Sequence, residues 1–416
     1  MTKSLGRPAW MSRPETDAVM DALEAAGGVG CARFVGGCVR NSLIGRRVDD
    51  VDIATWLEPD AVMAALEAAG LRAEPTGLEH GTVTAICKGR PYEITTLRRD
   101  VETDGRRATV SFTRDWAEDA ARRDFRLNAL YADRQGEIFD PTGEGVRDAA
   151  AGRIVFVGAP EARIREDYLR ILRLFRFQAW YGREPLAADA LSACAALREG
   201  MSRLAAERIS RELLKLLAAD DPRSAVRAMA ECGVLAIVLP HGFDLERFDR
   251  LVGIETEQLF TCDPELRLAA LGAVSEPAAL ALGRGLRLSN ALQARLVGAA
   301  GMQPRLTSWM SPRELRRAIH ALGQATLSDR IKLAWAASPR PAAGAQWRGL
   351  DALATTWTPP ALPITGDDIL KAGVPRGPLV GEVMREVEAW WIDHDFIDDK
   401  FSAIEKLKAV VQGLVY

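Results

Sequence analysis

The sequence has little that would suggest a zinc protein, a disulfide-bonded protein or a membrane protein. Its 416 residues include six cysteines without a CxxC pair and four scattered histidines, which argues against a zinc site and a disulfide framework. No apolar run approaches the roughly 18 residues of a membrane span, and the N-terminal segment lacks the apolar core of a signal peptide. These absences predict a cytoplasmic protein with reduced thiols and no membrane partner.

The chain also lacks a strong excess of either charge. Its net charge is −3, with 27% charged and 48% hydrophobic residues, which is an ordinary soluble composition. A basic groove can be offset by acidic surface elsewhere, so this balance does not exclude a nucleic-acid partner. The length predicts two to four domains, or one compact domain with an extended helical part.

The pattern of expected elements changes near residue 160. Before that point the sequence predicts helices at 14–26, 38–44, 59–69 and 116–127, strands at 32–35, 51–55, 82–87, 92–97, 130–132 and 137–139, and an exposed mobile loop at 98–115. Beyond it, segments rich in Ala, Leu and Arg are mostly helical in pattern. We therefore expect an α+β head followed by an extended all-helical part.

Two aspartates, Asp50 and Asp52, lie two residues apart where the expected strand 51–55 begins. On a strand, such residues share a face about 6.6 Å apart. Two carboxylates so placed can hold two Mg²⁺ ions about 3.5–4 Å apart for phosphoryl transfer. Glu93, in a strand that could lie beside the first, would be a third metal ligand or a base for an attacking hydroxyl. The alternative is that all three are solvated residues of strand edges.

The pair Gly36-Gly37 ends an apolar strand and precedes a short helix that carries Arg40. Such a turn offers backbone N–H groups to an anion, and a guanidinium can donate to the same phosphate. The alternative is a tight turn beside an exposed arginine, and a lone glycine pair matches neither a P-loop nor a dinucleotide-binding loop. A glycine pair ten to fifteen residues before two aspartates, with an arginine between them, is a far more specific pattern.

Five segments share their order with one known family. They are FVGGCVRN–LIGRRVDDVDIAT (34–55), ARRDFRLNALY (121–131), DPTGEGVRDAAAGRIVFVG (140–158), EDYLRILRLFRF (166–177) and ERISRELLKLL (207–217). Together they resemble the class II tRNA nucleotidyltransferase and bacterial poly(A) polymerase family of the DNA polymerase β superfamily. One position departs from this family, because Asn41 stands where an aspartate is usual. Asparagine can also cap a helix start, but any role of the negative charge would be lost.

The helix expected to contain Asp167 and Arg170 has a chemistry suited to choosing a base. A carboxylate accepts from the exocyclic amine of cytosine or adenine, and a guanidinium donates to ring acceptors. Uracil and guanine present a carbonyl instead, which leaves buried polar groups unpaired. The resemblance implies that Asp167 and Arg170 read the base and that Arg123, Arg173 and Arg176 contact the nucleotide. The alternative is a helix with salt-bridged surface charges.

The resemblance implies a fold, a reaction and partners. The fold would be a mixed-sheet, polymerase β-like nucleotidyltransferase head with a helical neck, body and tail. The expected parts are an N-terminal helix (1–28), the head (29–158), the neck (159–220) and an RNA-binding body and tail (221–416). Residues 98–114 correspond to a flexible loop of the family.

The expected reaction adds CMP and AMP from CTP and ATP to the tRNA 3′ acceptor end with two Mg²⁺ ions. Asp50, Asp52 and Glu93 would be catalytic, with Asp50 and Asp52 holding the metals. An A-adding enzyme or a poly(A) polymerase of the same family remains open, the latter disfavoured because the chain ends AVVQGLVY, without a basic tail. A non-catalytic RNA-binding protein with the same fold is the alternative of a different class.

Overall fold

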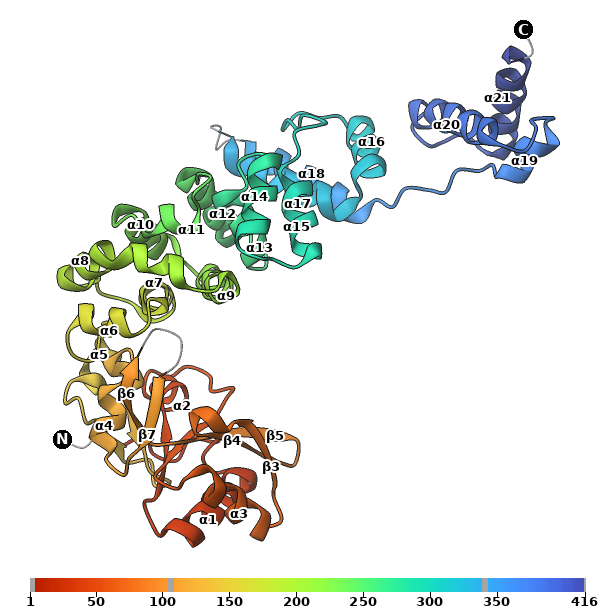
Figure 1. The fold of residues 1–416 in the computed structure, drawn as a ribbon. Helices are drawn as coiled ribbons and strands as arrows, with labels where there is room; N and C mark the ends of the chain where they lie inside the picture. The colour runs from red at the N-terminus through yellow and green to blue at the C-terminus, as the bar shows by residue number, and fades with distance from the viewer. Residues whose placement is uncertain (1–3, 104–107, 339–342, 415–416) are drawn as a thin grey trace. The chain divides into compact units, whose positions relative to one another are not determined.

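A computed structural model describes residues 4–103, 108–338 and 343–414. The chain divides into two compact units, Met1–Pro240 and His241–Tyr416. Within the described residues every strand lies in the first unit, and the second unit is helical (Figure 1). The predicted order, an α+β head before a long helical part, is therefore confirmed.

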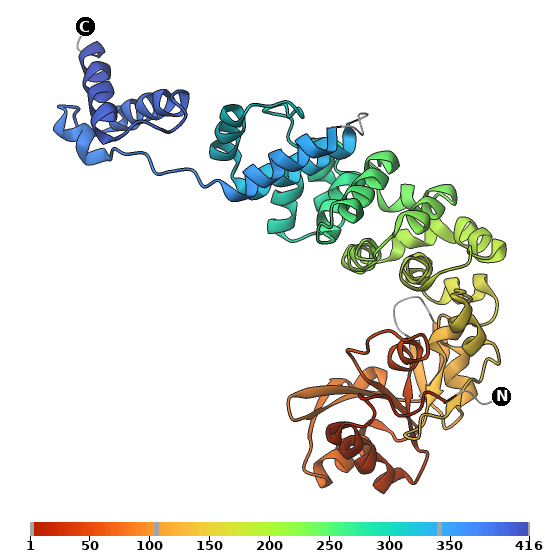
Figure 2. The same cartoon turned by 180° about the vertical axis from the view of Figure 1, so that it is seen from behind.

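The first unit is organised around a seven-stranded mixed sheet (Figures 1 and 2). Its strands are β1 (Ala32–Val35), β2 (Asp52–Thr55), β3 (Arg72–Gly77), β4 (Thr82–Cys87), β5 (Arg90–Thr96), β8 (Tyr131–Ala132) and β9 (Ile138–Phe139). They lie in the order β3-β4-β5-β2-β1-β8-β9. Strands β2 and β5 run parallel, and the other neighbouring pairs run antiparallel. This order places β2 at the centre of the sheet.

Short helices accompany the sheet and the turns between its strands. They are α1 (Pro14–Gly27), α2 (Gly37–Leu43), α3 (Pro59–Ala68), α4 (Trp116–Ala121), α5 (Gly145–Ala151) and the 3₁₀ helices η1 (Leu78–His80) and η2 (Arg126–Asn128). Proline begins both α1 and α3, where its missing N–H costs nothing and its φ is already helical. Gly28, with φ +83°, follows the last residue of α1, a conformation that glycine adopts without strain.

Three local predictions in this unit are wrong. Residues 98–115 contain a hairpin of β6 (Arg98–Thr103) and β7 (Ala108–Phe112) rather than a loop throughout. The part of the expected loop that includes Arg106 and Arg107 lies outside the described residues. The helix expected at 116–127 ends at Ala121, because the next residues turn to form buried ion pairs. A helix, α5, occupies the middle of the segment 140–158, where no helix was expected.

The remainder of the first unit is helical. Its elements are α6 (Pro160–Glu166), α7 (Leu169–Tyr181), α8 (Ala188–Leu197), η3 (Arg198–Arg203), α9 (Ala206–Leu217), α10 (Arg223–Glu231) and α11 (Val234–Val238). Helix α7 packs against α9 and α10 and buries Ile171, Leu172 and Phe175 completely or nearly so. These three residues lie on one apolar face of α7. Burying each large apolar side chain stabilises the fold by about 1.5–3 kcal/mol.

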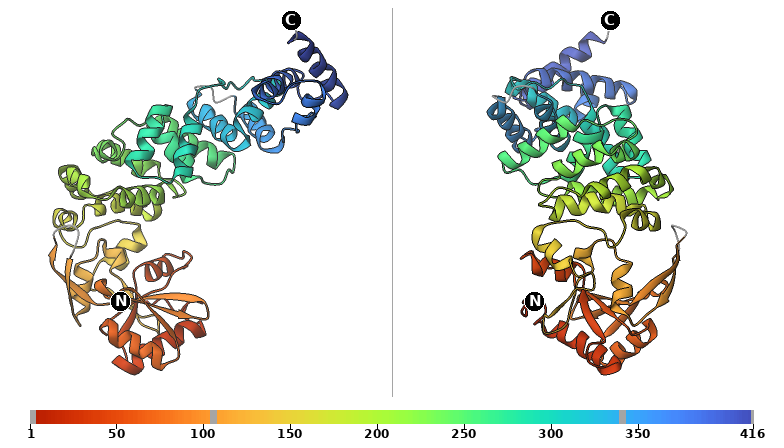
Figure 3. Two further views of the ribbon diagram at one scale, coloured as in Figure 1. Left: turned by 45° about the vertical axis from the view of Figure 1, so that its right-hand side comes forward. Right: turned by 90° about the vertical axis from the view of Figure 1, so that its left-hand side faces the viewer.

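The second unit consists of helices within the described residues (Figure 3). They are α12 (Leu245–Glu257), α13 (Pro264–Gly272), α14 (Glu276–Gly285), α15 (Asn290–Ala300), α16 (Pro312–Leu322), α17 (Gln324–Ala337), α18 (Gly344–Thr356), α19 (Gly366–Lys371), α20 (Pro378–Asp393) and α21 (Lys400–Gly413). No single one of them is long and apolar enough to cross a membrane, although the bent pair α13–α14 reaches that length and composition together.

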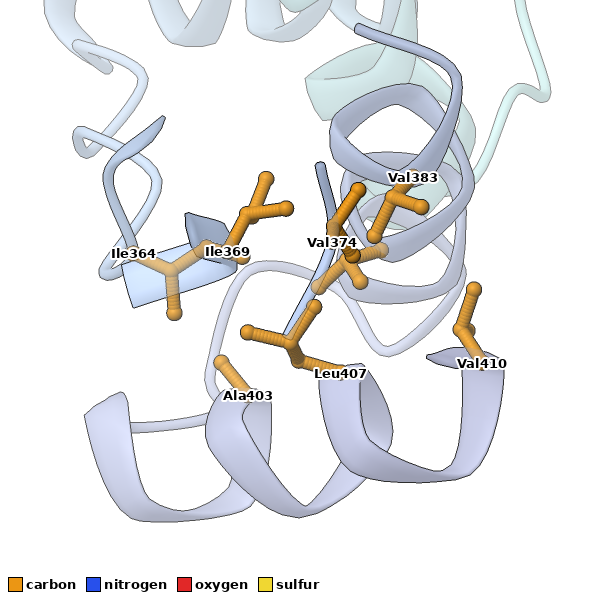
Figure 4. Packing of buried hydrophobic residues seen from close by; sticks show 8 residues of the cluster. Ile364, Ile369, Val374, Val383, Ala403, Leu407 and Val410 are labelled. Atoms are coloured by element: carbon orange, nitrogen blue, oxygen red, sulfur yellow. The ribbon is translucent and has the colours of Figure 1, made fainter. Parts of the chain in front are cut away.

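The last three helices of the second unit enclose a core of their own (Figure 4). It is formed by buried side chains from α19, α20, α21 and the adjoining loops, namely Ile364, Ile369, Val374, Val383, Val387, Ala403, Leu407 and Val410. Ion pairs join this bundle to α16, with Arg316 bonded to Asp395 and Arg317 bonded to Asp393. The bundle is thus held to the rest of its unit by charged groups as well as by its chain connection.

Candidate active site

The predicted phosphate-binding turn lies between β1 and α2. Gly36 has φ +68° and precedes the first residue of α2. A Cβ on Gly36 would lie 3.8 Å from Arg123 Nη1, and a Cβ on Gly37 would lie 3.9 Å from Arg40 Nη2. Both arginine head groups therefore face the glycine pair. Helix α2 has only seven residues, so the guanidinium groups, more than a helix dipole, make this turn attractive to an anion.

The structure brings Asp52 and Glu93 together. They are direct register partners in the parallel pair β2–β5, in which neighbouring strands lie about 4.8 Å apart. Strand β2 begins at Asp52, so the expectation that Asp50 shares this strand is wrong. Asp50 is exposed in the segment that leads into the strand. It is the loop before β2, rather than strand periodicity, that places this carboxylate.

Burial raises the pKa of Asp52 to about 6, and the neighbouring carboxylates of Glu93 and Asp50 add to this effect. Arg123 and Arg40 oppose it only in part. Concentrated negative charge with hard oxygen donors fits a divalent cation, which would relieve the repulsion. No group of three or more His, Cys, Asp or Glu residues in the described part of the chain is arranged to hold a metal. Phosphate and water oxygens would therefore have to complete the coordination.

Arg40 is buried, with only 7% of its surface exposed. It donates hydrogen bonds to Oδ1 of Asn128 and to the hydroxyl of Tyr181, the latter at 2.8 Å, and its guanidinium lies 4.0 Å from the centre of the Tyr181 ring. Burial lowers the pKa of Arg40. Both partners are neutral, so they orient the guanidinium without neutralising it.

Asn41 does not cap the start of α2, a role that asparagine could have taken in place of the usual aspartate. It lies inside α2, and its Oδ1 accepts hydrogen bonds from Nε and Nη2 of Arg40 at 3.2 and 2.9 Å. Its Nδ2 donates to the carbonyl of Arg47 at 3.0 Å. The side chain thus connects Arg40 to the loop that carries Asp50.

The arginines of the RRDF segment share one carboxylate that the sequence interpretation missed. Arg122 and Arg123 both pair with Asp119, at 2.6 and 3.0 Å, and Tyr131 donates to the same carboxylate at 2.7 Å. Although burial alone would raise the pKa of Asp119, these cations hold it at about 2. The pairing was detectable in principle, because Asp119 lies three and four residues before the two arginines in an expected helix.

Asp124 pairs with neither of its neighbouring arginines, Arg122 and Arg123. It accepts from Nε of Arg173 at 2.8 Å and from Nδ2 of Asn128 at 3.0 Å. Burial opposes the charge, but Arg173 and these hydrogen bonds hold the pKa of Asp124 at about 2. Because Asn128 also contacts Arg40, a continuous network joins the glycine turn to α7.

The predicted base-reading pair has a different geometry from the one expected. Asp167 is not helical, with φ −152° and ψ 107°, and separates α6 from α7. Its carboxylate accepts from the Leu169 backbone N–H at 3.0 Å and from Arg208 at 2.8 Å. Arg170 pairs with Glu166 instead of Asp167. Arg176 forms an ion pair at 3.2 Å with Glu212 of α9.

Two families match parts of this chain. Residues 32–155 match the family described as the Poly A polymerase head domain, and residues 185–245 match the one described as the probable RNA and SrmB-binding site of polymerase A. Among full-length relatives, the mitochondrial CCA tRNA nucleotidyltransferase 1 of Mus musculus is 31% identical over 383 residues, covering 90% of this chain and 86% of its own. The CCA-adding enzyme of Levilactobacillus brevis is 31% identical over 91% of this chain and 92% of its own.

Solved structures extend the similarity to the whole fold. The crystal structure of the Bacillus stearothermophilus CCA-adding enzyme in complex with CTP superposes with a TM-score of 0.72 at 26% identity, covering 92% of this chain and 94% of the other. The Thermotoga maritima CCA-adding enzyme complexed with tRNA has a TM-score of 0.67 over 96% and 99% of the two chains. At 18% identity, the second likeness concerns the fold alone.

Proposed function

The chain belongs to the family of CCA-adding tRNA nucleotidyltransferases, and from this premise we propose that it adds CMP and AMP from CTP and ATP to the tRNA 3′ end. The observation that carries the proposal is the pairing of Asp52 with Glu93 beside a glycine turn and the buried Arg40. Carboxylates and an uncompensated cation, side by side, are what a metal-bound triphosphate requires. The 3′-hydroxyl of the RNA would attack the α-phosphate, and pyrophosphate would leave.

Asp50 and Asp52 are the proposed ligands of two Mg²⁺ ions. Such ions, when bound, stabilise the charge that develops on the attacking and leaving oxygens. Glu93 lies next to Asp52 in the register and would complete the ligand set or take the proton of the attacking hydroxyl. Burial first and the neighbouring carboxylates second raise the pKa of Asp52, and a bound cation would offset both effects.

The triphosphate would lie against Gly36 and Gly37. Arg40 and Arg123 both face this pair, but they differ in charge balance. Arg123 is already ion-paired with Asp119, whereas Arg40 has neutral hydrogen-bond partners. We therefore assign the stronger phosphate contact to Arg40.

Base selection is assigned to Asp167 and Arg170, with Arg173 and Arg176 as neighbouring contacts. The Asp167 side chain is 30% exposed and, with about four acceptor positions on its carboxylate, retains some for an exocyclic amine. Arg208 fixes its orientation. Arg173 and Arg176 are engaged with carboxylates, so their first role would be to hold α7 in place.

The tRNA would be held mainly by the helical body and tail, proposed as residues 221–416. Contacts to phosphates would make this affinity fall with salt, and recognition would depend on shape more than on sequence. The cytoplasmic location stays a prediction. Relatives of this chain include mitochondrial proteins, so membership of the family does not decide the compartment.

Incubation with three tRNA substrates tests the proposed function. The substrates end before CCA, after the first C and after CC, and each receives labelled CTP or ATP. CCA addition predicts C incorporation on the first two, A incorporation on the third and a stop after the complete CCA. Incorporation of A on the CC end alone would indicate an A-adding enzyme, a long A ladder a poly(A) polymerase, and no incorporation a non-catalytic protein.

A further inference from the structure

The five arginines expected at the nucleotide differ in the charge of their partners. Four are ion-paired, Arg123 with Asp119, Arg170 with Glu166, Arg173 with Asp124 and Arg176 with Glu212. Arg40 forms no ion pair with any carboxylate in the part of the chain that the structure describes. Its hydrogen bonds go to Asn41, Asn128 and Tyr181. Among these arginines it is thus the one without a carboxylate at ion-pairing distance, although the more distant Asp52 and Asp124 still interact with its charge.

A buried guanidinium without a direct ion-pair partner destabilises the folded protein. Arg40 is 7% exposed, and a buried cation without an anion has lost much of its hydration. Burial accordingly lowers its pKa. An anion that arrives beside Gly37 would restore the missing negative charge. The proposed triphosphate is such an anion, so the absence of a protein carboxylate works in favour of nucleotide binding.

Asn41 supplies orientation without charge. Its Oδ1 accepts from two guanidinium nitrogens of Arg40, and its Nδ2 is fixed by the carbonyl of Arg47. This network also determines which way the amide points, because the flipped amide would set N–H groups against N–H groups. An aspartate of the same shape could accept the same two bonds from Arg40. It would, however, form an ion pair with Arg40 and offer the Arg47 carbonyl no donor.

We propose that Asn41 is a positioning residue that aims Arg40 at the triphosphate and, by being neutral, keeps the charge of Arg40 available to the phosphates. The inference rests on the proposed function. It predicts that Asn41 sets nucleotide affinity for CTP and ATP alike, since both carry the same triphosphate. It predicts no part for Asn41 in the choice of base.

The test compares Asn41→Asp with Asn41→Ala in the full chain on tRNA ending before CCA and on tRNA ending in CC. For N41D we expect KM for CTP and ATP to rise by about tenfold, with kcat within twofold and KM for tRNA unchanged. The inhibition constant of inorganic tripolyphosphate should rise by the same factor, because that probe has no base or sugar. N41A removes the orienting acceptor without adding charge, so KM should rise by only about threefold. The exposed Gln135, in the turn between β8 and β9, provides the control Q135E, which makes the same change of an amide to a carboxylate and should leave both KM values unchanged.

Several results would overturn the inference. These are an N41D enzyme with KM values within twofold of wild type, equal effects of N41D and N41A, or an effect on one nucleotide only. Aspartate has the shape of asparagine, so a Tm of N41D more than about 5 °C below wild type would also contradict the described geometry. A wild-type chain that adds no nucleotide to any tRNA would refute the proposed function instead, while tripolyphosphate binding by wild type and N41D would still test the role of Asn41.

Discussion

Replacing Asp124 by asparagine should destabilise the first unit, because this residue joins the strand-bearing part of the unit to α7. The carboxylate is 8% exposed and bonded to Arg173, Asn128 and the Phe125 backbone N–H. Its pKa falls from the ordinary 3.8 to about 2. At about 1.4 kcal/mol per pH unit, this lowering corresponds to roughly 2 kcal/mol of stability at neutral pH. The Asp124→Asn variant would keep the shape of the side chain and lose that contribution.

The stability difference between wild type and Asp124→Asn should also depend on pH. A carboxylate whose pKa is lowered by folding contributes fully above its unfolded pKa and loses the contribution as pH falls through the folded value. The difference between wild type and Asp124→Asn should therefore be roughly 2 kcal/mol at pH 7 and about half of that at pH 3. The measurement is urea unfolding followed by tryptophan fluorescence. The exposed Asp60 supplies the control Asp60→Asn.

A difference below about 0.5 kcal/mol at pH 7, the range of ordinary surface substitutions, would refute the role of the Asp124–Arg173 pair. A difference that stays constant between pH 7 and pH 3 would refute the electrostatic origin of the effect.

Three further predictions concern the site. Asp52→Asn should leave tRNA affinity within about twofold and the Tm no lower than wild type. The reason is that burial and the neighbouring carboxylates raise the pKa of Asp52 and so make its charge unfavourable; a clear loss of Tm would contradict this. Asp167→Ala should raise misincorporation of UTP and GTP relative to CTP and ATP in primer-extension assays on tRNA, and unchanged selectivity would refute the base-reading assignment. Chelation of divalent ions with EDTA should stop incorporation and added Mg²⁺ should restore it, whereas turnover in EDTA would exclude the metal-ligand role of Asp50 and Asp52.

The central part of the site could be predicted because its signals are local. β-branched and apolar residues flank Asp52 and Glu93 in two short strands. The expectation that these strands lie side by side is confirmed, and they run parallel. The glycine pair and Arg40 lie within five residues of one another, so a single strand-to-helix turn brings them together. The prediction that Asp167 lies inside a helix is wrong, because the apolar pattern continues across the break between α6 and α7. At this break the Asp167 carboxylate accepts two hydrogen bonds. One of them comes from Arg208, 41 residues later, which no local pattern could indicate.

The hydrogen-bond partners of two arginines could also not be predicted, because they lie far away in the sequence. Tyr181 reaches Arg40 across 141 residues, and Asp124 reaches Arg173 across 49. Sequence spacing predicts that a cation has a partner within one helical turn, but not which distant carboxylate or hydroxyl packs beside it. The neutral surroundings of Arg40 could therefore be established only from the folded chain.

The most direct test of the account is the 3′-end sequence of tRNA before and after incubation with this protein, CTP and ATP. Starting from tRNA that ends before CCA, the wild-type chain should yield ends that read CCA and no longer. The Asp52→Asn variant should leave the ends unchanged. Unextended ends with wild type, or CCA ends produced by the variant, would contradict the claim that these carboxylates catalyse CCA addition.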